Sequence, residues 1–206
     1  MEKNKFSRFA CIVDSLGIEN SIAWALILCN LAYSSEFNWW INHIEFDTVY
    51  TTDKIKELLL DENDTAKTHI SSAFKNILIS NPILGKEVGL GYCDFIVKND
   101  KRYLNSVQRI AWSEPDAKVI LYSLYKFAEA CGEYYQFTLT RLMDTTIESD
   151  GVSPVQIFGL DRETMVGLLK GLATNYPEFI SVTFTLDLDN INLRQDKTAA
   201  DILDLF

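Results

Sequence analysis

Eight polar and basic side chains between residues 67 and 102 have the types and spacing of a nucleic-acid contact surface. Lysine and arginine neutralise phosphate, and serine and threonine hydroxyls bond to phosphate oxygens or base edges. The alternative is an ordinary solvated helix face followed by a solvated turn. The predicted contact residues are Lys67, Thr68, Ser71, Ser72 and Lys75 on the free face of a helix, and Lys98, Lys101 and Arg102 at a hairpin tip.

The elements predicted around these residues would position them as a winged helix-turn-helix does. Residues 48–51 are β-branched and aromatic, which favours a short strand. A capped helix is predicted to about Leu60, and a second over 65–80, with Ile70, Phe74 and Leu78 on its apolar face. Residues 92–98 and 102–110 flank the tight turn Asn99-Asp100 and predict a hairpin. In such a fold the second helix enters the major groove and the hairpin, or wing, meets phosphate.

The same order of elements recurs later in the chain. Residues 137–195 repeat the strand, helix, helix and hairpin of residues 47–108, and a helix over 161–175 aligns with that over 65–80. The predicted fold class is therefore α+β and mostly helical, with tandem winged helix-turn-helix lobes and small β-hairpin wings. The predicted domains are residues 1–112, comprising N-terminal helices plus the first winged helix, and residues 113–206, an acidic winged-helix-like lobe.

The segment before the first repeat is predicted to be helical and buried. A loose end is expected at residues 1–5, a short helix at 6–16, and a helix that is apolar on nearly every side at about 21–34. The bulky cluster at residues 37–41 is interpreted as a core plug or a turn that packs the lobes together, in preference to a ligand-stacking site.

The charge is strongly acidic and unevenly spread. The net formal charge is −10; residues 1–112 hold 12 basic and 14 acidic side chains, a net of −2, and residues 113–206 hold 7 and 15, a net of −8. Residues 65–110 hold seven basic and three acidic side chains, a net of +4. Strong, generic nucleic-acid binding by the whole chain is not expected, because the field of the entire surface repels phosphate. Asp187 and Asp189 in the second wing favour a protein partner there.

Other kinds of chemistry find little support in the sequence. The four cysteines are widely separated and lack zinc or redox spacing, and two histidines are too few for a multi-histidine metal site. No nucleophile and base have a supporting local motif, and no phosphate-binding glycine loop occurs. No enzyme, metal or cofactor is therefore expected. No signal peptide or membrane span is expected, which predicts a cytoplasmic protein.

Three segments together resemble a known family. They are Gly17–Leu31, Asp64–Pro82, and Ser153–Asp161 with the helix that follows and a closing LDLDNINLR stretch. In this order they are similar to the bacterial domain-of-unknown-function 4007 family. The resemblance covers about residues 6–206, although the chain is shorter than expected for that family. Members tend to be encoded near sulfurtransferases and DNA phosphorothioation genes of phage-defence islands, so the resemblance implies a genetic setting and transfers no site residue.

The sequence therefore leaves two functions open. The first is a DNA-binding accessory or regulatory protein of a bacterial DNA-modification or anti-phage system, which contacts duplex DNA through the first winged helix. It would use the acidic C-terminal lobe for a protein partner or a homodimer. The alternative is an adaptor that binds no DNA and uses both winged helices for protein–protein docking.

Overall fold

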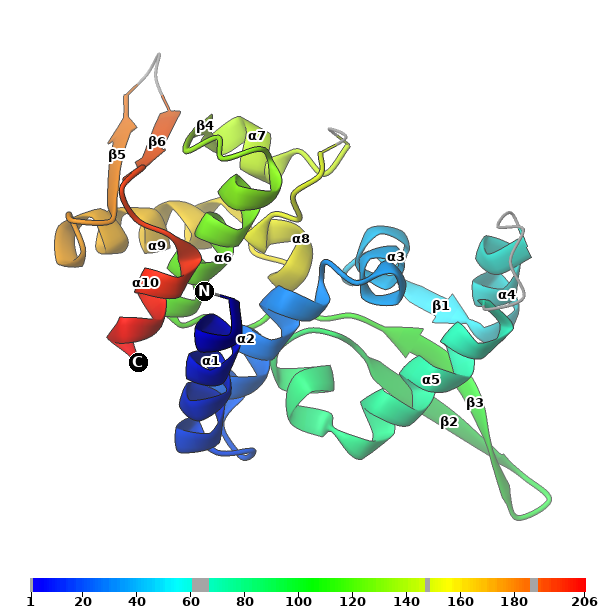
Figure 1. The fold of residues 1–206 in the computed structure, drawn as a ribbon. Coiled ribbons are helices and arrows are strands. Elements are labelled where there is room, and N and C mark those ends of the chain that lie inside the picture. Colours follow the sequence, from blue (N-terminus) through cyan, green and yellow to red (C-terminus); the bar gives the residue numbers. More distant parts are fainter. Residues whose placement is uncertain (1, 61–66, 147–148, 186–188) are drawn as a thin grey trace.

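The computed structural model describes residues 2–60, 67–146, 149–185 and 189–206, without the side chains of residues 2–7, 60, 67–69 and 71. The fold is α+β and mostly helical, as expected. Two small three-stranded antiparallel sheets lie at opposite sides of the molecule, with helices between them (Figure 1).

Three helices open the chain: α1 (Glu2–Leu16), α2 (Ser21–Leu31) and α3 (Ser35–His43). The expected loose end at residues 1–5 was wrong from residue 2 onward, because α1 already begins at Glu2. Asn20 caps α2 by accepting a hydrogen bond from the Ile22 N–H. The bulky cluster at 37–41 lies within α3, where three of its members are buried in the core: Trp39, Trp40 and Ile41.

The first sheet belongs to the predicted strand, helix, helix and hairpin. The order is β1 (Val49–Thr51), α4 (Thr52–Leu60), α5 (Lys67–Ser80), β2 (Tyr92–Lys98) and β3 (Lys101–Gln108). The sheet order is β1-β3-β2, so the N-terminal strand pairs with the second strand of the hairpin. A π-helix, η1 (Ile83–Glu87), was not predicted; it brings Gly85 so close to Gly91 that any Cβ there would lie 2.6 Å from the Gly91 carbonyl oxygen.

The second sheet repeats this order. After α6 (Ala117–Ala130) come β4 (Gln136–Thr138), α7 (Leu139–Met143), α8 (Pro154–Phe158), α9 (Arg162–Asn175), β5 (Ile180–Phe184) and β6 (Asp189–Leu193). The sheet order is again strand, second hairpin strand, first hairpin strand: β4-β6-β5. Where the first half of the chain (residues 1–112) has the single helix α4, the second half (residues 113–206) has α7 and α8. The chain closes with α10 (Ala199–Ile202) and a 3-10 turn, η2 (Leu203–Leu205).

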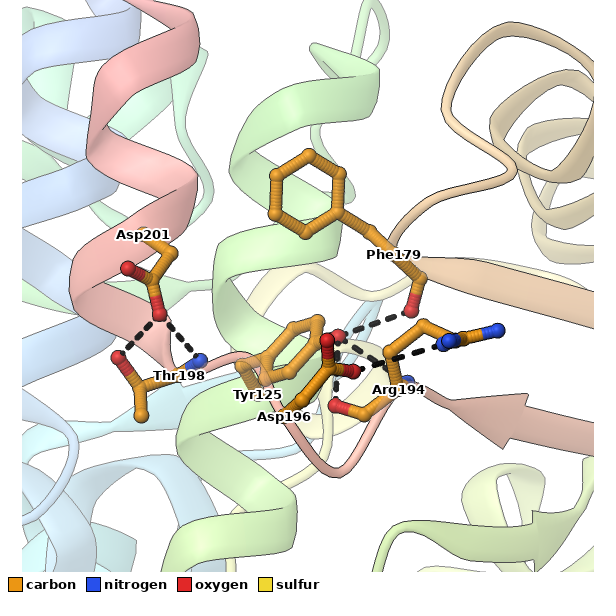
Figure 2. A network of polar contacts seen from close by, with 6 residues as sticks. All are labelled: Tyr125, Phe179, Arg194, Asp196, Thr198 and Asp201. Atoms are coloured by element: carbon orange, nitrogen blue, oxygen red, sulfur yellow. Dashed lines mark hydrogen bonds and ion pairs between the residues drawn. The ribbon is translucent and has the colours of Figure 1, made fainter.

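A buried tyrosine fastens the second sheet to α6 (Figure 2). The Tyr125 hydroxyl lies 2.8 Å from the Phe179 carbonyl oxygen and 3.2 Å from the Arg194 carbonyl oxygen, and it accepts from the Arg194 N–H at 3.2 Å. Nearby, Thr198 and Asp201 form a capping box at the start of α10. Burial raises the pKa of Tyr125, so its phenol stays protonated and keeps its donor.

The two halves share a hydrophobic core. Buried side chains from both form one continuous cluster, and α2 of the first half packs against α6 of the second. At the predicted boundary, the Trp112 N–H donates to the Phe158 carbonyl oxygen at 2.9 Å, and the two rings lie 5.0 Å apart. The division at residues 112 and 113 stays a prediction. Within the described residues, no helix is both long and apolar enough to cross a bilayer.

Candidate nucleic-acid interface

Helix α5 is held in place by its apolar face. Ile70, Phe74 and Leu78 are buried and recur every four residues, so they form one stripe along the helix. The Phe74 ring stacks on Trp40, with centroids 4.2 Å apart and planes within 3° of parallel. The opposite face of α5 therefore points away from the core, and it includes the exposed Ser72.

The structure describes only some of the side chains on α5 that were predicted to contact DNA. The backbone places residues 67, 68 and 71 within the helix, but the side chains of Lys67, Thr68 and Ser71 lie outside the described part of the structure. Ser72 is exposed and Lys75 is half-buried. Burial raises the pKa of the Cys93 thiol on β2, and the charge of Lys75 opposes that rise. Lys75 therefore lies beside the base of the hairpin.

The β2–β3 hairpin carries the other predicted contact residues. Its turn is Asn99-Asp100, and both residues have positive φ (50° and 59°), as a tight two-residue hairpin turn requires. Lys98 and Lys101 are paired directly across the two strands. All three predicted cations of the hairpin, Lys98, Lys101 and Arg102, are exposed at its tip, which stands clear of the helices (Figure 1).

The strand register divides these cations between the two faces of the hairpin. Lys98 and Lys101 are opposite one another, and residues opposite one another share a face. Arg102 is opposite Val97 on the other face, where its guanidinium lies 4.4 Å from the centre of the Phe95 ring. The three cations thus share the tip but not one face.

Arg109, which sequence reasoning counted as part of the positive window, is not at the surface. It is fully buried at the end of the hairpin, and its guanidinium lies 3.9 Å from the centre of the Phe46 ring. Its five N–H groups donate to five backbone carbonyl oxygens at 2.8–3.2 Å, which belong to Ile41, Ile44, Gly89, Gln156 and Ile157. Arg109 therefore joins the first sheet to α3 and, across the junction, to α8.

The burial of Arg109 corrects the charge estimate for this region. The window 65–110 has seven basic and three acidic side chains, and removal of Arg109 leaves six against three, a net of +3. Burial also lowers the pKa of Arg109, to about 9, which leaves it charged at neutral pH. The only sequence signal for this role was its place just before the apolar segment Ile110–Trp112.

In the second half, the corresponding β5–β6 hairpin carries an acidic residue, Asp189, in place of the cations of the β2–β3 hairpin. The Asp189 carboxylate, at the start of β6, accepts from the Thr140 N–H at 3.3 Å and the Thr140 hydroxyl at 3.0 Å. It also lies 3.9 Å from the Arg162 guanidinium of α9. Asp189 thus stabilises α7 and pairs with a cation inside its own lobe. Asp187, the other acidic residue predicted to repel phosphate, lies outside the described residues.

Among the described residues, no group of three or more His, Cys, Asp or Glu side chains could hold a metal ion. Comparison with protein-family models, curated protein sequences and solved structures gives no significant match. The resemblance described from the sequence therefore stays a prediction.

Proposed function

We propose that the chain binds duplex DNA through α5 and the β2–β3 hairpin, in the manner of a winged helix. The observation that carries this proposal is the direct pairing of Lys98 with Lys101 at an exposed, projecting tip. Like charges directly opposite one another destabilise a hairpin. A bound phosphate between or beside them removes that repulsion, so an anionic surface is the natural partner of this tip.

The arrangement of elements supports the same proposal. The order strand, helix, helix and hairpin, with sheet order β1-β3-β2, is the order that a winged helix requires, which supports the proposal. The second helix, α5, packs against β2, so a duplex contacted by the exposed face of α5 also lies within reach of the hairpin. Ser72 and Lys75 would face the duplex from the helix, and the tip cations would contact its backbone.

The proposed binding is modest and sensitive to salt. Only a few cations make the contact, and the chain as a whole carries a net charge of −10. The surface outside the hairpin therefore repels phosphate, and screening by salt weakens the local attraction. We expect micromolar affinity at low ionic strength and a loss of binding at physiological salt.

Charge reversal at the tip tests the proposal. The double variant Lys98→Glu/Lys101→Glu is titrated against a fluorescent duplex at low salt, followed by anisotropy. A matched control, Lys170→Glu/Lys197→Glu, makes the same change of charge in the second half of the chain. The proposal predicts at least about tenfold weaker binding for the tip variant than for the control. Equal binding by the two variants would contradict it.

A second function is favoured by exposed apolar side chains in the same region. Val97 and Tyr103 near the tip are 67% and 48% exposed, and Ile79 on α5 is 52% exposed. Such side chains suit a protein partner, as an adaptor would need. If the chain is an adaptor, a tagged protein purified from its native host should bring down a defined partner without nucleic acid, and Val97→Asp/Tyr103→Asp should release that partner. Retention of the partner by the variant would count against this function.

The wider role proposed for the chain rests on the sequence resemblance. It is that of an accessory or regulatory protein in a bacterial DNA-modification or anti-phage system, with the acidic C-terminal lobe bound to a protein partner or a second copy. The net charge of −8 over residues 113–206 supports a protein contact there rather than a second DNA contact. The identity of the neighbouring genes tests this role: unrelated genes beside it would contradict it.

A further inference from the structure

A cavity lies at the junction of the two halves, separate from the hairpin tip. Its walls come from α3 and residues 44–46 on one side, and from residues 145–146 and 149–152, α8 and residues 159–160 on the other. Its volume is about 670 Å³. That volume is in the range of cavities that hold small organic ligands. We call it the junction cavity.

The wall of the junction cavity includes a buried positive charge without a carboxylate partner. Arg109 contributes to this wall, is fully buried, and bonds only to backbone carbonyl oxygens. Among the described residues, no carboxylate lies within ion-pair distance of it. Buried charges are normally paired, because the protein interior screens them poorly. The carbonyl dipoles and the Phe46 ring stabilise the guanidinium of Arg109, but neither carries a formal negative charge.

Three carboxamide side chains along the same wall are joined by consecutive hydrogen bonds, and we call this chain of amides the carboxamide ladder. The Gln156 Nε2 donates to Asn42 Oδ1 at 3.4 Å, the Asn42 Nδ2 to Asn38 Oδ1 at 2.9 Å, and the Asn38 Nδ2 to the Ala32 carbonyl oxygen at 3.2 Å. At the other end, Gln156 Oε1 accepts from the Ser153 N–H at 2.9 Å. A backbone acceptor and a backbone donor thus fix the direction of every amide in the ladder.

The ladder leaves donors for a ligand. Each carboxamide nitrogen has two N–H groups and uses one of them in the ladder, so each of the three retains one. The three side chains that carry them, Asn38, Asn42 and Gln156, all line the junction cavity. Donors already held in position bind an acceptor at little cost in conformational entropy. Three such donors near an uncompensated cation favour a negatively charged acceptor.

The remaining walls indicate the kind of anion. Ile41, Val155 and Leu160 supply apolar surface, which suits a carbon skeleton better than a bare inorganic ion. Glu45 is the only carboxylate among the lining residues, and it is solvent-exposed. This exposed carboxylate weakens anion binding only through a screened repulsion and leaves the donors of the ladder available.

We propose that the junction cavity binds a small organic anion, with a phosphate or carboxylate group held by the carboxamide ladder near Arg109. The site is distinct from the hairpin tip and does not rest on DNA binding. The shared chemistry is an anionic phosphate or carboxylate group on a carbon skeleton. AMP serves as the phosphate probe, citrate as the carboxylate probe, and adenosine as a neutral probe that differs from AMP only in the phosphate.

Calorimetric titration of the full chain at constant ionic strength tests the proposal. We expect AMP or citrate to bind, and the bound anion to be preferred over adenosine by at least about tenfold, because the buried charge attracts only the anion. Binding of AMP without citrate assigns a phosphate site, and binding of citrate without AMP assigns a carboxylate site. Equal affinity for AMP and adenosine, or no binding by either anion, would overturn the proposal.

Two variants locate the bound anion. Asn42→Asp places a negative charge in the middle of the ladder at an exposed position, and it should weaken binding of the anion at least about fivefold. Asn175→Asp makes the same chemical change at an exposed position outside the cavity and should leave binding unaltered. Glu45→Gln removes the carboxylate at the mouth and should tighten binding. If Asn42→Asp and Asn175→Asp behave alike, the anion does not occupy the junction cavity.

Discussion

Removal of the Arg109 side chain should destabilise the protein more than any other single loss of charge. The substitution Arg109→Met keeps much of the apolar stem but leaves five carbonyl oxygens without their donor. Each buried carbonyl without a partner costs about 1–3 kcal/mol. The cost of burying a guanidinium, several kcal/mol, disappears at the same time.

The balance of these terms gives an expected loss of about 3–5 kcal/mol in the free energy of unfolding, as found when one partner of a buried charged network is removed. That loss is a large share of the stability of a typical protein, about 5–15 kcal/mol. Arg109→Lys keeps the charge but has three N–H donors in place of five, so its loss should be smaller than that of Arg109→Met.

Urea unfolding, followed by tryptophan fluorescence and circular dichroism, measures these losses. Arg102→Met is the matched control, because Arg102 is exposed on β3, the strand that ends just before Arg109, and contacts only the Phe95 ring among the interactions described. Its loss should stay below about 1 kcal/mol. A loss of less than about 1 kcal/mol for Arg109→Met would refute the idea that this side chain joins the two halves.

Four further substitutions, one of them a control, should separate the roles of backbone, cap and buried hydroxyl in the same unfolding assay. Gly159→Ala should cost more than about 2 kcal/mol, because φ is +70° and a Cβ would lie 2.6 Å from the Phe46 ring, whereas Gly167→Ala in α9 meets no atom within 4 Å and should stabilise by up to about 1 kcal/mol. Equal effects would contradict this contrast. Ser153→Ala should cost about 1 kcal/mol through loss of the α8 cap, and no loss would show that the cap is dispensable. Tyr125→Phe should cost about 1 kcal/mol, since it removes the hydrogen bonds of the hydroxyl while the Phe179 and Arg194 carbonyl oxygens keep their backbone donors; an unchanged midpoint would argue that water replaces the hydroxyl.

Local patterns in the sequence were sufficient to predict helix α5 and the β2–β3 hairpin. The fourfold spacing of Ile70, Phe74 and Leu78 indicates one buried helix face, and all three are buried. Asn99-Asp100 between two β-rich segments indicates a tight hairpin, and it forms the turn between β2 and β3. These features depend on residues that are close in sequence, which is why they could be predicted.

The role of Arg109 could not be predicted because its partners are far away in the sequence. Its acceptors lie 65–68 residues before it, 20 residues before it, and 47–48 residues after it. A count of charges treats every arginine as exposed, which is correct for most arginines and wrong for this one. The positive window therefore appeared stronger in the sequence than it is on the surface.

The junction cavity was invisible in the sequence for a similar reason. Asn38 and Asn42 have the spacing of neighbours on a helix, but the third carboxamide, Gln156, is 114 residues from Asn42. The π-helix at Ile83–Glu87 was also missed, because it depends on the approach of Gly85 to Gly91 after the chain reverses. In both cases tertiary packing, rather than local propensity, determines the structure.

The salt dependence of DNA binding tests the central proposal most directly. The logarithm of the association constant is measured against the logarithm of salt concentration for the wild-type chain and for Lys98→Gln/Lys101→Gln. If both lysines contact phosphate, the slope of the variant should be shallower by about 2, since each contact contributes about 0.9. An unchanged slope, or a wild-type chain that does not bind duplex DNA at low salt, would contradict the proposal that the β2–β3 hairpin contacts DNA.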